Sequence, residues 1–145
     1  MEALPTLLRK QGYKKIKFII SKTNHLLVKA KVNGVRGVFI LDTGASNSCV
    51  GFESVDWFQL QAKSSNTQAS GAGAIGMLTQ LAQNNTLQIG RWHSKEFHLV
   101  IFDLSHVNMA LLQHNAKTVH GIIGADVLME SAAIIDYHNQ LLYMK

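Results

Sequence analysis

The strongest constraint on the fold is an unbroken apolar run, Val38–Leu41, that leads directly into Asp42, Thr43 and Gly44. An apolar run without alternation predicts a strand that is buried on both faces. A carboxylate at the end of such a strand is costly to bury unless neighbouring groups stabilise it. Gly44 permits a sharp turn and the close approach of another chain, and the Thr43 hydroxyl can hold that turn by hydrogen bonds. Asp42 is therefore the leading candidate for a functional carboxylate.

Short strands separated by turn signals make up much of the remaining chain. Leu26–Asn33 alternates apolar and polar residues after its first two positions, and Asn33-Gly34 is typical of a tight hairpin turn. Further strands are predicted at Leu87–Gly90, Phe97–Phe102, Ala132–Asp136 and Gln140–Met144. A chain of 145 residues is one domain's worth. We therefore predict a single all-β fold, closed or sandwiched.

Helical patterns are scarce. Asp126–Ser131 is predicted to be a short helix, Ser105–His114 is a second candidate, and Glu53–Leu60 is predicted to be a short helix or turn. Gln61–Ser70 is polar and is interpreted as a loop. Gly71–Gly76 is interpreted as a glycine-rich tip between two strands.

Positive charge is concentrated near the N-terminus. Residues 1–36 contain nine Lys and Arg and one acid, for a charge of +8, and residues 37–145 contain five Lys and Arg and eight acids, for −3. We interpret residues 1–24 as a basic extension or arm that precedes the domain at 25–145. A solvated tail with a polar strand face is favoured, and contact with nucleic acid or an anionic surface is the less favoured alternative.

The sequence predicts a cytoplasmic protein. No apolar run approaches the length of a membrane span, and the first residues lack the apolar core of a secretory signal. The single cysteine, Cys49, cannot form an internal disulfide and is interpreted as a core residue. A removed leader or an anchor outside this chain stays an open alternative.

The order of these segments resembles the retropepsin-like aspartic peptidases of the bacterial type, over roughly residues 26–144. Asp42–Ala45 is similar to the family's catalytic loop, and Ser70–Gly76 is similar to its mobile flap. Ile122–Gly124 is similar to the apolar-apolar-Gly segment beneath the catalytic loop, and Asp126–Leu128 to the start of its helix. The resemblance implies an acid protease barrel at 25–145 with one short C-terminal helix, a flap hairpin and a closing hairpin.

The resemblance also implies an aspartic endopeptidase that cleaves a peptide or protein substrate. Asp42 is its catalytic residue, with Thr43 and Gly44 supporting the loop. The residues expected to bind substrate are Ala45, Gly71, Ala72, Gly73 and Ile75. This chemistry uses two carboxylates that share one proton, so that one is a base while the other is an acid. The chain has one Asp-Thr-Gly, so a homodimer is expected to supply the second Asp42. We expect no metal and no cofactor.

Other interpretations stay open. Asp126 and Asp136 are weaker candidates for a second carboxylate, because a helix cap and a turn explain them. The acid–Arg pair common in retroviral members is replaced by Ser46 and Ala125. The alternative function is a catalytically silent peptide-binding or assembly module on the same fold. The seven histidines show no metal-ligand spacing.

Overall fold

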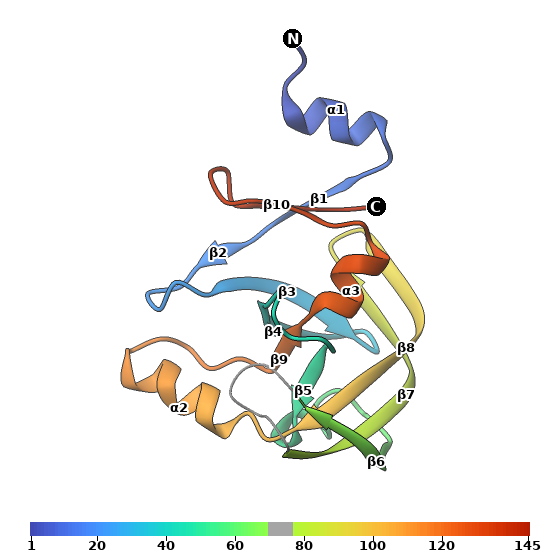
Figure 1. Ribbon diagram of the computed structural model, residues 1–145, viewed down its shortest axis with the longest axis vertical. Helices are drawn as coiled ribbons and strands as arrows, with labels where there is room; N and C mark the ends of the chain where they lie inside the picture. Colours follow the sequence, from blue (N-terminus) through green and yellow to red (C-terminus); the bar gives the residue numbers. More distant parts are fainter. Residues whose placement is uncertain (70–76) are drawn as a thin grey trace.

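Six strands close into a barrel in the computed structural model, which describes residues 1–69 and 77–145 (Figure 1). Their order around the barrel is β3-β4-β9-β5-β8-β7, and β7 pairs back onto β3 through Lys31–Gln88 and Val32–Leu87. Their bounds are β3 Leu26–Val32, β4 Val35–Leu41, β5 Cys49–Gly51, β7 Met77–Ile89, β8 Trp92–Phe102 and β9 Gly121–Ile123. The predicted all-β barrel is confirmed.

The β3–β4 hairpin forms as the local sequence predicts. Asn33 and Gly34 have positive φ values of 51° and 79°, and Val32 pairs with Val35 across a two-residue turn. Positive φ at both central positions is what a type I′ turn requires, and asparagine and glycine adopt it most readily. This turn sets the register of β4 and therefore the position at which Asp42 emerges.

Strand β4 is buried on both faces, as its unbroken apolar run predicts. Phe39 belongs to the cluster that fills the barrel, whereas Ile40 packs into a second cluster on the outer side. Fully burying one such side chain contributes roughly 1.5–3 kcal/mol. Packing on both faces of β4 therefore fixes the strand that leads to Asp42.

A second, three-stranded sheet joins the two ends of the chain. Its order is β1-β11-β10, with β1 at Lys14–Lys17, β10 at Ile134–Asp136 and β11 at Leu141–Met144. Helix α1 (Leu4–Lys10) precedes β1, and β2 (Ile19–Ile20) pairs with β3 at the edge of the barrel sheet. Residues 1–24, interpreted as a basic extension, therefore contribute one helix and two paired strands. Where the domain begins stays a prediction.

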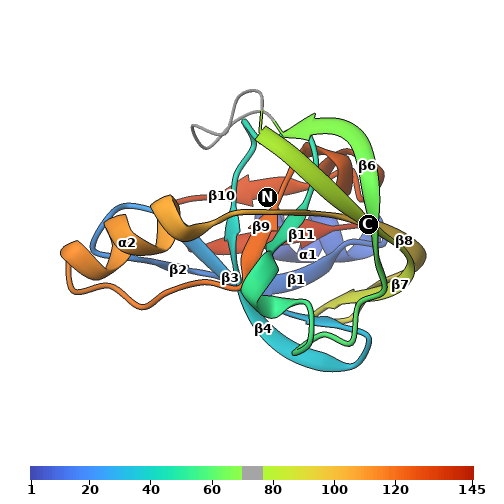
Figure 2. The same cartoon turned by 90° about the horizontal axis from the view of Figure 1, so that it is seen from below.

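Within residues 1–69 and 77–145, two of the three α-helices lie near predicted positions. Helix α3 (Ala125–Glu130) and helix α2 (Ser105–Gln113) match the predicted segments, while α1 was not predicted. A single 3-10 turn, η1 (Phe52–Ser54), begins the predicted helix-or-turn segment. Figure 2 shows α2 projecting to one side of the barrel. No helix in the described part of the chain is both long and apolar enough to cross a membrane.

The interpretation of Gln61–Ser70 as a loop is wrong. Ala62–Ala69 forms strand β6, which pairs antiparallel with β7 from Ala62–Ala82 to Ala69–Met77. An edge strand gains its stability from main-chain pairing and tolerates polar side chains, so its sequence carries little strand periodicity. The expected flap tip, 70–76, lies outside the described residues.

Candidate active site

Asp42 lies where two parallel strands end side by side. Strands β4 and β9 pair in parallel from Phe39–Gly121 to Leu41–Ile123, so Asp42 and Gly124 leave the sheet at the same edge. The Asp42 N–H donates to the Ile123 carbonyl at 2.9 Å. The barrel therefore fixes the backbone of the candidate catalytic residue through a partner some eighty positions away in sequence.

The Asp42 carboxylate is oriented by its own loop. The Gly44 N–H donates to Asp42 Oδ1 at 2.9 Å, and the Ala45 N–H donates to the Asp42 carbonyl at 3.2 Å. A Cβ placed on Gly44 would lie 3.3 Å from Oδ1, which is tight. Asp42 is half-buried, while Thr43 and Gly44 are exposed. The loop thus fixes the orientation of the Asp42 carboxylate beside the exposed residues Thr43 and Gly44.

Ala45 and Gly124 join the loop to the segment beneath it. The Ala125 N–H donates to the Ala45 carbonyl at 2.7 Å. A Cβ on Gly124 would lie 2.5 Å from that same oxygen, so only glycine fits here. The Ala45 side chain is buried. Contact between Ala45 and substrate stays a prediction.

The sequence analysis missed a hydrogen-bond network behind this loop. The Ser48 hydroxyl donates to Asp126 Oδ1 at 2.7 Å and accepts the Gly124 N–H at 2.8 Å. The Ser48 N–H donates to both Asp126 oxygens, at 2.9 and 3.0 Å. Bonds to a carboxylate are about twice as strong as neutral ones. This network ties the Asp42 loop to the first turn of α3.

Both alternative carboxylates, Asp126 and Asp136, form hydrogen bonds that stabilise the structure around them. Asp126 accepts the Val127 N–H at 2.8 Å, so it stabilises the start of α3, although Gly124 is the N-cap. Asp136 accepts the Asn139 N–H and side-chain amide at 3.1 and 2.8 Å, which lowers its pKa. The interpretation of Asp136 as a turn residue is confirmed. The interpretation of Asp126 as the helix cap is wrong, because Gly124 is the N-cap and the Asp126 carboxylate bonds to Ser48 and Val127 instead.

A pocket of about 300 Å³ opens beside Asp42. Its walls include Asn24, His25, Thr43, Ile135 and Tyr137 together with Asp42. The sequence analysis did not associate His25 or Tyr137 with the site, because they come from the turn before β3 and from the end of β10. The expected substrate-binding residues Gly71, Ala72, Gly73 and Ile75 lie outside the described residues.

Cys49 lies behind the loop, where its thiol is shielded from solvent. It is 2% exposed, and burial raises the pKa of its thiol far above the ordinary range. The negative charges of Asp126 and Asp42 raise the pKa further, against a hydrogen bond with the Ile122 backbone that lowers it. The interpretation of Cys49 as a core residue is confirmed. In the segments 1–69 and 77–145 no group of three or more His, Cys, Asp and Glu is placed to hold a metal ion.

Comparison with known proteins identifies a family for the chain but no individual curated relative. A family model described as aspartyl protease matches residues 28–127. None of the curated proteins matches the chain.

Three solved structures share the fold. A retropepsin-like aspartic protease from Rickettsia conorii aligns with a TM-score of 0.62 and 20% identity, over 91% of this chain and 89% of that one. The retroviral protease-like domain of Ddi1 from Leishmania major aligns at 0.56 and 16%, over 83% and 88%. The EIAV protease complexed with the inhibitor HBY-793 aligns at 0.54 and 18%, over 76% and 90%.

Proposed function

The chain belongs to the aspartyl protease family, and from this premise we propose that it is an aspartic endopeptidase that acts as a homodimer. The observation that carries the proposal is the Asp42 carboxylate, held by the Gly44 N–H at the mouth of a pocket. Asp126 and Asp136 are engaged in local structure. A second copy of the chain is therefore the best source of the partner carboxylate.

An exposed apolar surface next to Asp42 supports the dimer. Tyr137 and Ile134 on the β10 side are exposed, as are Ile19 and Ile20 of β2. The Phe18 and Tyr137 rings meet edge to face at 6.4 Å, so the β1–β2 segment and the end of β10 lie together. Tyr137 also lines the Asp42 pocket. Apolar surface of this kind is typical of protein–protein contact.

In the proposed mechanism two Asp42 carboxylates face each other and hold one proton between them. Like charges at short range disfavour double ionisation, so one carboxylate is a base and the other an acid. The base takes a proton from a water molecule as the water oxygen attacks the peptide carbonyl carbon. The acid gives its proton to the carbonyl oxygen. The carboxyl group that took the water proton then gives it to the amide nitrogen, while the other carboxylate removes a proton from one hydroxyl of the tetrahedral species. The C–N bond breaks, the amine leaves, and the pair again holds one proton.

The substrate in this proposal is an extended peptide. The flap residues Gly71, Ala72, Gly73 and Ile75 are proposed to cover it and to pair with its backbone as an added strand. Thr43 is proposed to connect the two loops across the dimer axis, where it is exposed in the single chain. We propose a preference for apolar side chains beside the scissile bond, because peptide-binding pockets are mostly apolar.

The test combines sedimentation across protein concentrations with cleavage of a peptide library at mildly acid and neutral pH. A dimer that cleaves, and an Asp42→Asn dimer that does not, is the expected result. Asp136→Asn is the matched control, because it removes a carboxylate that serves a turn, and it should retain cleavage. Cleavage that persists in Asp42→Asn would overturn the mechanism. A folded monomer that binds peptides without cleaving them would favour the silent binding module.

A further inference from the structure

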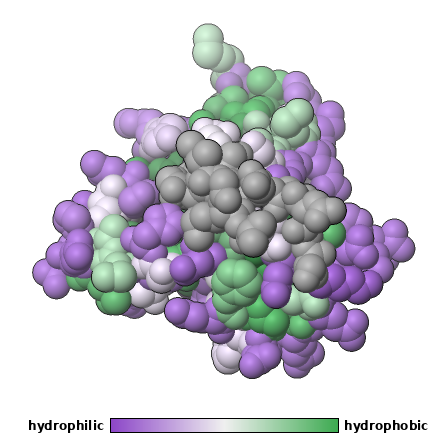
Figure 3. All heavy atoms as spheres, turned by 60° about the horizontal axis from the view of Figure 1, so that its bottom comes forward, coloured by the Kyte–Doolittle hydropathy of each residue, from purple (hydrophilic) through white to green (hydrophobic). Residues whose placement is uncertain are grey.

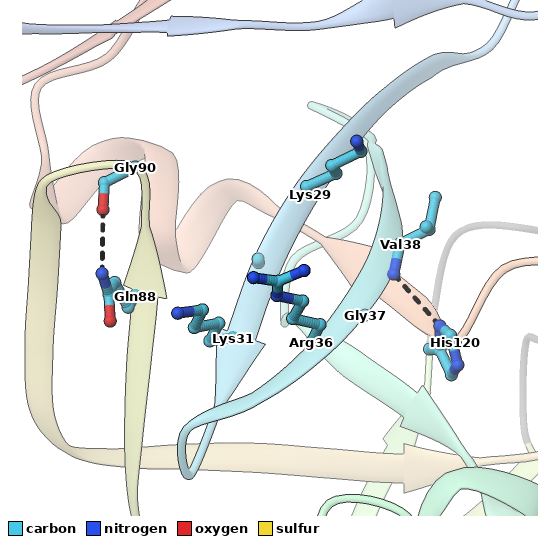
Figure 4. Close-up of a pocket in the computed structure, with 9 residues that line it drawn as sticks. Lys29, Lys31, Arg36, Gly37, Val38, Gln88, Gly90 and His120 are labelled. Carbon is cyan, nitrogen blue, oxygen red and sulfur yellow. Dashed lines mark hydrogen bonds between the residues drawn. The ribbon is translucent and has the colours of Figure 1, made fainter.

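A second cavity, of about 660 Å³, lies on the β3–β4 hairpin well away from Asp42. Arg36, at the start of β4, is six positions before Asp42, and a strand rises about 3.3 Å per residue, so the two are roughly 20 Å apart. Lys29 and Lys31 come from β3, while Gln88 and Gly90 close the far side. Figure 4 shows Lys31 and Arg36 extending into the space toward Gln88.

This cavity is strongly cationic. It is lined by Lys29, Lys31 and Arg36 and by no Asp or Glu, and none of the three cations has an ion-pair partner within the described residues. Lys31 and Arg36 are also direct partners across the β3–β4 pair. Like charges placed opposite each other on neighbouring strands destabilise a sheet. Repulsion between Lys31 and Arg36 therefore destabilises the free hairpin, and a bound anionic group would neutralise these two charges.

A second pocket, of about 490 Å³, shares the lining residue His120 with the cationic cavity. Its walls include three side chains that are more than half exposed, Trp57, Met109 and Leu112. In Figure 3 apolar surface is visible at the lower left, where α2 lies. One carboxylate, Glu53, also lines this pocket. Three cations therefore line the first pocket, and three exposed apolar side chains line the second beside polar groups and one carboxylate.

Trp57 is exposed but rigidly held. Its indole N–H donates to the Arg36 carbonyl at 2.9 Å, and its ring stacks on His120 with centroids 6.2 Å apart and planes 14° apart. The Val38 N–H in turn donates to His120 Nδ1 at 3.0 Å. An immobilised aromatic ring loses little entropy on binding, and tryptophan and arginine dominate binding hot spots.

We propose that the two pockets form one docking site for an acidic, amphipathic segment of a partner protein. Carboxylates of that segment bind Lys29, Lys31 and Arg36, and an adjacent large apolar side chain packs between Trp57 and α2. The exposed Trp57, Met109 and Leu112 of the second pocket favour a protein over a nucleic acid, which needs cations along its whole track. Glu53 disfavours anionic groups in the second pocket, so the acidic part of the segment is assigned to the first. Asp42 contributes nothing to this site, so the inference is independent of the proposed function.

The experiment is fluorescence anisotropy with the Asp42→Asn variant, which excludes cleavage of the probe. The probe is a short fluorescein-labelled peptide of glutamates followed by Leu-Trp-Leu, and its control replaces each glutamate with glutamine. We expect saturable binding that weakens with salt. The double variant Lys31→Glu, Arg36→Glu should weaken binding by about tenfold or more, as expected for charge pairs at an interface.

Two further variants separate the two halves of the site. Trp57→Ala should weaken binding without changing its salt dependence, because it removes the aromatic ring and its hydrogen bond to the Arg36 carbonyl but no charge. Lys95→Glu is the matched charge reversal at an exposed lysine that lines neither pocket, and it should bind as the parent does. Circular dichroism melting confirms that each variant is folded.

Several outcomes would overturn the proposal. These are no saturation at millimolar peptide, equal binding of the glutamine peptide, or unchanged binding in the double variant. Displacement of the peptide by single-stranded oligodeoxythymidylate that binds more tightly would reassign the site to nucleic acid.

Discussion

Replacing Ser48 by alanine tests whether the link between the Asp42 loop and α3 stabilises the candidate site. The substitution removes a hydroxyl that donates to Asp126 and accepts the Gly124 N–H, at 2.7 and 2.8 Å. A hydrogen bond to a charged group contributes about 1.5–3 kcal/mol, and a buried N–H left unpaired costs about 1–3 kcal/mol. Asp126 keeps the Ser48 and Val127 N–H groups. We therefore expect the free energy of unfolding to fall by about 3 kcal/mol, near the lower end of that sum.

Ser131→Ala is the matched control. Ser48 and Ser131 are both fully buried, but the Ser131 hydroxyl donates mainly to the Val127 carbonyl, at 2.9 Å. That carbonyl also receives the Ser131 N–H, so the variant strands no acceptor. We expect a loss of about 1 kcal/mol, the ordinary contribution of a neutral hydrogen bond.

Urea unfolding followed by circular dichroism measures both variants. All samples need one protein concentration, because the proposed dimerisation would make apparent stability depend on concentration. Equal slopes against urea allow the midpoints to be compared directly as free energies. A Ser48→Ala loss no larger than that of Ser131→Ala would refute the reasoning, since the carboxylate bond and the stranded Gly124 N–H would then have no measurable effect.

Three further predictions follow from buried groups. Burial raises the pKa of the Cys49 thiol, so thiol reagents should modify the native protein far more slowly than the urea-unfolded chain, and equal rates would contradict its placement. Gly121→Ala would set a Cβ 2.1 Å from the Cys49 carbonyl, so the variant should fail to fold or melt far lower; near-parent melting would refute this. Burial lowers the pKa of His120, although the Val38 hydrogen bond raises it in part. The contribution of His120 to stability is therefore present above its unfolded pKa of about 6.5. That contribution is lost as the pH falls through the folded value. Parent stability should then fall more on acidification than that of His120→Asn, as thermal melts at several pH values would show.

The sequence predicts those parts of the fold that depend on local chemistry. Asn33 and Gly34 encode their turn through positive φ, and the apolar run that ends at Leu41 encodes a buried strand. Strand β6 escaped prediction because its stability comes from pairing with β7, which side-chain periodicity does not record. Helix α1 is a short segment of seven residues, too short for a clear helical period.

The candidate site also combines contacts that the sequence predicts with contacts that it does not. Asp42 and Gly44 are neighbours in sequence, and their contact through the Gly44 N–H could be expected from the motif. Ser48 and Asp126 are 78 positions apart, and neither residue type signals a partner at that distance. Tyr137 reaches the Asp42 pocket only because the end of β10 lies beside the Asp42 loop. Such contacts are set by the closed barrel rather than by any local pattern.

The parallel pairing of β4 with β9 has a consequence for biosynthesis. Asp42 is bound by Ile123, and β1 pairs with β11, which ends at Met144. Contacts of such high sequence separation form slowly, because a long loop must close before they contribute. On the ribosome, the Asp42 loop therefore gains its partner only after β9 has been translated. Under the proposed function, a nascent chain cannot contribute its Asp42 to an active site before that strand has been synthesised.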